Sequence, residues 1–285
     1  MKRFLFVIAF LPLCLACSKD TPKPAASEMP TEVLEHLSFE HFETVQTKQS
    51  YGYHVFYEQD PDGTRYDIWA SGNEGAAITN SKRKPEKFPT YATADGYQGY
   101  ALCLNTQSSG TLGSLVGKPI AAGSLYLGRF NSGKVMSDAL KTTEFGIAVD
   151  RQPLKVSGWY KYSPGEKFTD KDKNVIADRT DEANIYGVFW LGSDSGGKTV
   201  TLYGDNLLTS PYIVSKAQVS ELPPTDTWSP FEMTFEGGEV DADILAAFGY
   251  RFTLVFSSSK GGDAFEGAIG STLLVDEVEV TFAER

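Results

Sequence analysis

Asp276 is the carboxylate for which this sequence makes the clearest chemical case. Period-two alternation along the last apolar segment places Asp276 on one face with Leu274, Val278, Val280 and Phe282, and places the polar residues between them on the other face. A carboxylate among apolar side chains is costly to bury unless it is paired. We therefore expect Asp276 either to accept hydrogen bonds from backbone N–H groups or to pair with a lysine or arginine.

A second acidic segment, residues 170–181, has the oxygen spacing of a calcium loop. Oxygen-bearing side chains stand at its first, third, fifth, ninth and twelfth positions, namely Asp170, Asp172, Asn174, Asp178 and Asp181. Val175 replaces the glycine that the sharp turn of such a loop requires. The sequence therefore favours a solvated loop over an ion site in this segment.

No catalytic constellation is recognisable. Glycoside hydrolysis needs two carboxylates across a cleft, and the 37 acidic residues single out no pair. A Gly-x-Ser-x-Gly elbow and a His-Glu-x-x-His segment are both missing, and the three histidines are His36, His41 and His54. Catalysis thus has no positive indication, and a glycoside hydrolase with an unidentified acid pair stays open as an alternative.

Aromatic residues could instead bind sugar, because pyranose faces pack on exposed rings while amide or carboxylate groups bond the hydroxyls. The chain has 4 Trp, 14 Tyr and 18 Phe. In the alternation of their strands, Trp159 and Trp190 lie on the face opposite to apolar neighbours. Trp69 lies at the end of a predicted strand, and Asn73 follows it four residues later. The predicted carbohydrate-binding residues are Trp69, Asn73, Trp159 and Trp190, with core packing as the alternative for each tryptophan. Trp228 is predicted to pack in the core.

The N-terminus carries a processing signal. A basic pair, Lys2 and Arg3, precedes an apolar run over residues 4–16, and Cys17 follows directly. This pattern resembles the lipobox of bacterial lipoproteins, which implies removal of residues 1–16, lipidation of Cys17 and a flexible tether over residues 17–31. An ordinary secretory signal is the alternative. We expect anchoring to the bacterial outer membrane, facing the cell surface or the periplasm, with membrane contact through the lipid only.

Cys103 lies in an apolar run and is expected to be buried.

The segments that must position these residues are strands. Apolar residues from 32 onward keep period two, turn signals recur, and no alternation of strands and helices indicates a parallel sheet. We predict an all-β fold, a single jelly-roll β-sandwich domain over residues 32–285 with long loops and short helices near 32–36, 134–140 and 241–248. The formal charge of −11 argues against a nucleic-acid partner.

Several clusters along the body resemble the putative carbohydrate metabolism domain found in lipoproteins of polysaccharide-degrading Gram-negative bacteria. They are Trp69–Asn73, Pro89–Thr90, Ile120–Tyr126, Gly158–Tyr162 with Pro164–Gly165, Ile185–Tyr186, and Gly267–Val278. The resemblance covers roughly residues 38–283 and implies a jelly roll like those of carbohydrate-binding modules. Such jelly rolls often hold a structural calcium with a terminal Asp and a Glu from a Phe-Glu pair, which correspond here to Asp276 and Glu40.

The expected function is carbohydrate binding during glycan capture or metabolism. The expected partners are an oligo- or polysaccharide and other glycan-uptake proteins, and the only expected cofactor is structural calcium. A structural lipoprotein that binds no sugar is a further alternative. A concave cleft lined by two or more aromatics with acids nearby would separate a binder from such a scaffold.

Overall fold

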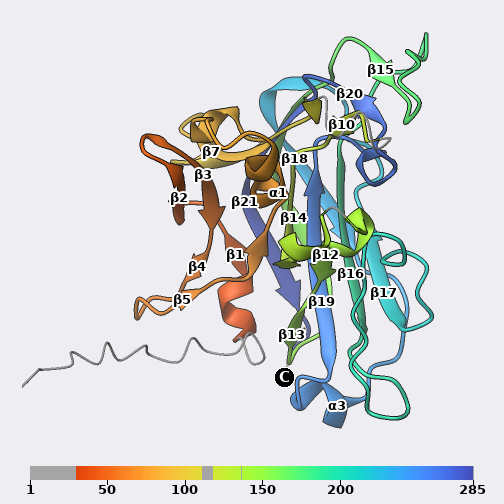
Figure 1. Cartoon of the computed structure of the whole chain (residues 1–285). Coiled ribbons are helices and arrows are strands. Elements are labelled where there is room, and N and C mark those ends of the chain that lie inside the picture. The colour runs from red at the N-terminus through yellow and green to blue at the C-terminus, as the bar shows by residue number, and fades with distance from the viewer. Residues whose placement is uncertain (1–29, 111–117, 136, 285) are drawn as a thin grey trace, which may run out of the picture.

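The computed structural model describes residues 30–110, 118–135 and 137–284, which form two antiparallel sheets packed face to face (Figure 1). The order of the first sheet is β18 (Thr225–Thr234), β14 (Pro153–Ser163), β21 (Thr272–Phe282), β8 (Ala101–Asn105) and β7 (Thr90–Thr93), with β1 (His36–Leu37) also on β21. The order of the second is β12 (Thr143–Phe145), β11 (Ser124–Phe130), β19 (Tyr250–Ser257), β16 (Asn184–Leu191) and β17 (Ile213–Gln218), with β13 (Ile147–Val149) on β19 and β6 (Trp69–Ala70) on β11. The predicted all-β jelly-roll sandwich is confirmed.

Short elements decorate the sandwich. The described residues also form four small sheets of two strands each. They pair β2 (Phe42–Lys48) with β3 (Tyr51–Phe56), β4 (Glu58–Gln59) with β5 (Arg65–Tyr66), β9 (Gln107–Ser108) with β10 (Ile120–Ala121), and β15 (Phe168–Thr169) with β20 (Gly267–Ala268). The described residues include the helices α1 (Asn73–Thr79) and α3 (Ala242–Ala246) and the 3-10 turns Thr31–Leu34, Pro85–Lys87, Ser132–Lys134, Ala139–Lys141 and Gly262–Ala264. Asp241 caps α3 by accepting hydrogen bonds from two of its first N–H groups, as expected for a helix near 241–248. Two 3-10 turns replace the helix predicted over 134–140, and α1 was not predicted.

The main core lies between the sheets and draws residues from Leu34 to Phe282. On β14, Val156, Tyr160 and Tyr162 are buried in this core, while Ser157, Trp159 and Lys161 are half-buried on the outer face. A smaller hydrophobic cluster covers the outer face of the second sheet, and its members are Tyr126, Phe145, Val188, Trp190, Leu202, Leu207 and Val255. The second sheet is therefore apolar on both faces, as strands beneath a long loop can be.

Strand β21 contains a bulge that turns Asp276 away from the core. Glu277 has a left-handed φ of 47°, and the pairing with β14 shifts so that Ser157 faces Glu279 while Trp159 faces Asp276. Leu273 and Val275 enter the core before the bulge, and Val278, Val280 and Phe282 enter it afterwards. The prediction that Asp276 shares a face with Val278, Val280 and Phe282 is wrong, because the extra residue reverses the alternation.

Candidate functional site

Three of the four residues predicted to contact sugar are buried instead. Trp69 is 5% exposed, and its indole N–H donates a 2.7 Å hydrogen bond to Glu58 Oε1. Asn73 is 0% exposed, and its amide binds Thr90 through both the Thr90 carbonyl oxygen and the Thr90 N–H. Trp190 is also 0% exposed, within the smaller hydrophobic cluster. The prediction for Trp69, Asn73 and Trp190 is wrong, because side chains packed in this way present no surface to a ligand.

Trp159 lies on the outer face of the first sheet, as its alternation on β14 predicts. Its ring stacks on Tyr97 with centroids 4.3 Å apart and an interplanar angle of 9°. Trp228 meets Tyr97 edge-on at 6.2 Å, is half-buried, and belongs to neither core cluster, so the prediction that it packs in the core is wrong. Sugar binding by Trp159 stays a prediction.

The second sheet carries a cleft of about 590 Å³ on its outer face. Its floor is formed by β11, β16 and β19, and its walls by α1, the β9–β10 pair and the loops around residues 130–143, 204–209 and 260–265. Five aromatic side chains line it: Tyr126, Phe130, Phe145, Tyr186 and Phe265. The position follows from the fold, because Tyr126 and Val255 alternate with core residues on β11 and β19 and so point outward.

Polar groups stand among these rings. Asn184 accepts a 2.8 Å hydrogen bond from Gln218 through Oδ1, and its amide lines the cleft beside Ser257. Burial and the nearby carboxylate of Asp263 raise the pKa of Tyr186, which keeps its hydroxyl protonated at neutral pH and able to donate.

The charged residues of the cleft are Arg83, Lys118, Lys260, Asp205 and Asp263. Both acids are exposed. Two buried carboxyl groups elsewhere have pKa values raised by desolvation, Glu58 to about 7 and Asp276 to about 6, and neither lines the cleft. The cleft therefore offers stacking and hydrogen bonding, and two acids that face solvent.

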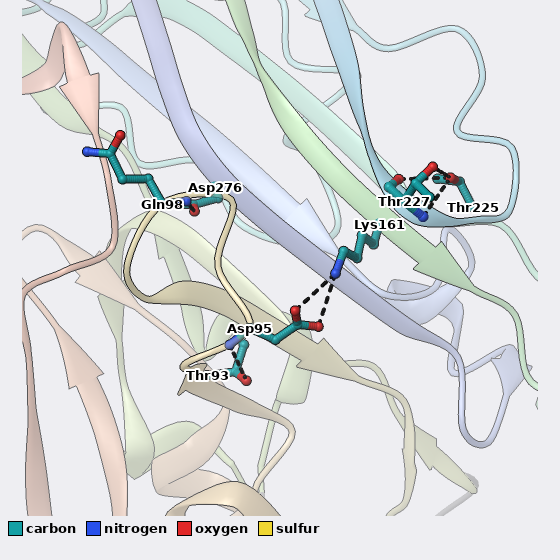
Figure 2. Close-up of polar contacts among 7 residues, drawn as sticks. All are labelled: Thr93, Asp95, Gln98, Lys161, Thr225, Thr227 and Asp276. Carbon is teal, nitrogen blue, oxygen red and sulfur yellow. Dashed lines mark hydrogen bonds and ion pairs between the residues drawn. The ribbon is translucent and has the colours of Figure 1, made fainter.

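The two predicted calcium ligands meet on one loop, residues 96–100. Asp276 is 0% exposed and accepts a hydrogen bond from the N–H group of Gln98 at 3.0 Å, and Figure 2 shows these two residues side by side. Asp276 also accepts a hydrogen bond from the N–H group of Glu277 at 2.9 Å. Glu40 Oε1 accepts one from the Tyr100 N–H at 2.6 Å. These contacts are those of the hydrogen-bonded alternative, and calcium binding stays a prediction.

Two carboxylates of the acidic segment 170–181 accept hydrogen bonds, Asp170 from within the segment and Asp181 from residues outside it. Asp170 accepts hydrogen bonds from the N–H groups of Asp172 and Asn174. Asp181 is buried elsewhere and accepts from Ser259, Ser271 and the Ala268 N–H. Within residues 30–110, 118–135 and 137–284, no group of three or more His, Cys, Asp or Glu side chains could hold a metal ion.

The sequence and the fold both match known proteins. A family model described as "Putative carbohydrate metabolism domain" matches residues 38–281. The chain belongs to this family. The resemblance deduced from the strand and turn motifs is thereby confirmed.

Two crystal structures share this carbohydrate metabolism domain fold over most of the chain. A "putative glycoside hydrolase" from Bacteroides thetaiotaomicron VPI-5482 is 36% identical, with a TM-score of 0.79 over 88% of this chain and 72% of that one. Another "putative glycoside hydrolase", from Bacteroides vulgatus ATCC 8482, is also 36% identical, with a TM-score of 0.79 over 87% of this chain and 98% of that one. No curated protein matches the chain.

The sequence led to predictions for two cysteines of this carbohydrate metabolism domain protein, Cys17 and Cys103. Cys17, the predicted lipidation site, lies outside the described residues. Cys103 is buried, and burial raises the pKa of its thiol to about 11, which confirms a packing role. Among the described residues, no helix has the length and apolar character to cross a membrane.

Sequence reasoning missed most residues of the cleft and the ring of Tyr97. Tyr186 belongs to a motif that predicted only a strand. Phe130 lies at the end of a strand and Phe265 lies in a loop, where no sequence pattern indicates a binding role. Of these residues, only Tyr97 could have been recognised from the sequence, because it lies between Gly96 and Gly99. Glycines on both sides of an aromatic residue indicate a tight loop that presents it.

Proposed function

We propose that this protein is a lipid-anchored outer-membrane protein that binds an oligosaccharide in the cleft over the second sheet, as part of glycan capture or metabolism. The cleft carries the proposal, because it combines aromatic rings with amide, hydroxyl and charged groups. Its volume of about 590 Å³ falls within the roughly 300–1,000 Å³ of small-ligand sites. Membership of a carbohydrate metabolism family supports a saccharide over other small molecules.

Phe265 is the ring best held for stacking. Its backbone has a left-handed φ of 61°, a conformation that a bulky residue adopts only where its surroundings hold it. The Lys118 ammonium lies 5.5 Å from the centre of its ring. Phe130 contributes a second half-buried ring from the end of β11. Together these rings give a saccharide apolar faces within reach of the Tyr186 hydroxyl and the Asn184 amide.

A glycan array of plant, algal and host polysaccharides, followed by titration of each positive oligosaccharide, tests the proposal. We expect micromolar to millimolar Kd values, and a five- to 100-fold loss of affinity in Phe265→Ala and in Phe130→Ala. Ile78→Ala is the matched control, because Ile78 lies on α1 beside the cleft, is 57% exposed and does not line it. Binding that all three variants retain would place the saccharide elsewhere, and absence of binding to every glycan would favour the scaffold alternative.

Hydrolysis is the second candidate, favoured by the names of the two related crystal structures and by the two acids in the cleft. Asp205 and Asp263 are the residues that would carry it. The same array samples are assayed for new reducing ends. Release of sugar that Asp205→Asn or Asp263→Asn abolishes, with binding retained, would move the protein to the glycoside hydrolases.

The lipid anchor rests on the lipobox pattern around Cys17. We expect Cys17→Ala to abolish lipid attachment and to shift the protein from the membrane to the aqueous phase on detergent partitioning. Ser18→Ala is the control, because it changes the neighbouring residue and leaves the acylated thiol. A Cys17→Ala protein that stays with the membrane fraction would contradict the lipoprotein assignment.

A further inference from the structure

The outer face of the first sheet carries three interacting rings, Tyr97, Trp159 and Trp228, which we call the aromatic platform. Tyr97 covers Trp159 in a parallel stack at 4.3 Å and meets Trp228 edge-on at 6.2 Å. Tyr97 is nevertheless 47% exposed, so one part of its ring faces solvent. Because Trp159 alternates with core residues on β14, the platform lies on the opposite side of the sandwich from the cleft.

A balanced ion pair stands at the platform. Figure 2 shows Lys161 directed at the carboxylate of Asp95. Its Nζ lies 3.0 and 3.1 Å from the two carboxylate oxygens, and 5.0 Å from the centre of the Trp228 ring. The ammonium and the carboxylate together present donors and acceptors without net charge.

The loop that carries Tyr97 is fixed from beneath. Buried Asp276 holds the Gln98 N–H, and Glu40 holds the Tyr100 N–H. Gly99 has a left-handed φ of 66°, and a side chain there would overlap the Glu40 carboxylate. A loop held at both N–H groups keeps its aromatic residue exposed in one place, so binding to that ring costs little ordering entropy.

We propose that the aromatic platform is a second saccharide site, which takes a neutral pyranose chain that packs on Tyr97 and bonds through its hydroxyls to Asp95 and Lys161. A flat ring suits the apolar face of a pyranose, and hydroxyls can bond to both members of an ion pair without a charge of their own. The site is distinct from the cleft, and its existence does not depend on saccharide binding there.

Tryptophan fluorescence reports on the platform through Trp159 and Trp228, and its loss in a Trp159 variant separates this signal from that of Trp190 beneath the cleft. The probes are hexasaccharides of β-1,4-linked glucose, xylose, mannose and galactose, together with any neutral glycan positive on the array. At least one is expected to change the emission with a Kd of micromolar to millimolar order. Tyr97→Ala and Trp159→Phe are expected to remove that change, and Tyr97→Ala to weaken binding five- to 100-fold.

Tyr100→Ala is the matched control. Tyr100 lies on the same loop and is 41% exposed, but its ring contacts Phe42 rather than the platform. Phe265→Ala serves as the second control, because a platform site retains its fluorescence response when the cleft is altered. A response that Tyr97→Ala leaves intact would overturn the proposal. So would saccharide binding that Phe265→Ala alone abolishes, or no response to any neutral glycan.

Discussion

The cleft and the aromatic platform lie on opposite faces of one sandwich and hold their rings by different means. In the cleft, Tyr126 and Tyr186 come from strands, above a hydrophobic cluster that includes Trp190. On the platform, Tyr97 comes from a loop that two carboxylates pin by hydrogen bonds. The floor of the cleft therefore depends on packing, which is hard to disturb without unfolding the sheet. The platform depends on a few polar contacts, which single substitutions and pH can alter.

The two surfaces also differ in what they could bind. A cleft surrounds more of a short ligand, whereas an exposed platform contacts one side of a longer chain. If both bind saccharide, two weak sites on one protein raise the apparent affinity for a polysaccharide long enough to reach both faces. This arrangement suits a protein that retains polymers at a membrane, as the proposed function requires.

The largest expected effect is a difference in stability between variants of a buried tryptophan, Trp190, and of a half-buried tryptophan, Trp159. Trp190→Ala removes a fully buried ring from the cluster beneath the cleft and is expected to lower the free energy of unfolding by about 3–5 kcal/mol. Trp159→Ala removes a half-buried ring from the outer face of the first sheet, and the loss in the free energy of unfolding should be clearly smaller. Denaturant unfolding of both variants measures the difference. Equal losses would show that the platform is as much a part of the core as the cleft floor.

A smaller effect comes from the proton on Asp276. Burial raises the pKa of this carboxyl in the folded protein to about 6 from its ordinary value of 3.8. Between these two pH values the folded state keeps a proton that the unfolded state releases, so the contribution of Asp276 to stability falls as pH rises from about 4 to 6 and is constant above that. The total change is at most about 3 kcal/mol.

Asp276→Asn is expected to flatten this part of the curve of unfolding free energy against pH. Glu58→Gln serves as the comparison, because the pKa of Glu58 is raised to about 7 and its pH window extends higher. An Asp276→Asn curve parallel to the wild type between pH 4 and 6 would show that Asp276 is ionised in the folded protein throughout.

The sequence predicted the sandwich but only part of either surface. Alternation on β14 correctly placed Trp159 outside and Tyr160 inside, because a regular strand obeys period two. The same rule misplaced Asp276 relative to Val278, because the left-handed residue Glu277 is invisible to a period count. Trp190 sits on a strand whose outer face is covered by Leu202 and Leu207 of the loop that follows the strand and by Phe145 of β12, and covering of this kind is decided by the tertiary fold.

Gly99→Ala tests the platform alone. The new side chain would need a left-handed backbone, at a cost of about 1–2 kcal/mol, and would displace the Glu40 carboxylate that holds the Tyr100 N–H. We expect the fluorescence response to neutral saccharides to be lost while ligands of the cleft bind as before. Gly63→Ala, at another left-handed glycine far along the chain in the β4–β5 turn, controls for strain itself. A Gly99→Ala protein with an unchanged response would show that the pinned loop does not position Tyr97.

The smallest expected effect is that of calcium on the same loop. An ion bound by Glu40 and Asp276 in the folded state alone would stabilise the protein by about 1.4 kcal/mol at ten times its Kd, equivalent to roughly 2–4 °C in Tm for a domain of this size. We expect millimolar calcium to raise the Tm relative to a chelator, and Asp276→Asn to remove most of that gain. Magnesium at the same concentration is the control, because it demands a more regular geometry than these carboxylates and backbone groups provide. Because a bound cation favours the ionised carboxylate, calcium should also flatten the pH dependence assigned to Asp276. Identical melting curves in calcium and chelator would leave Asp276 as a hydrogen-bonded anchor of the platform loop, held by the N–H groups of Gln98 and Glu277.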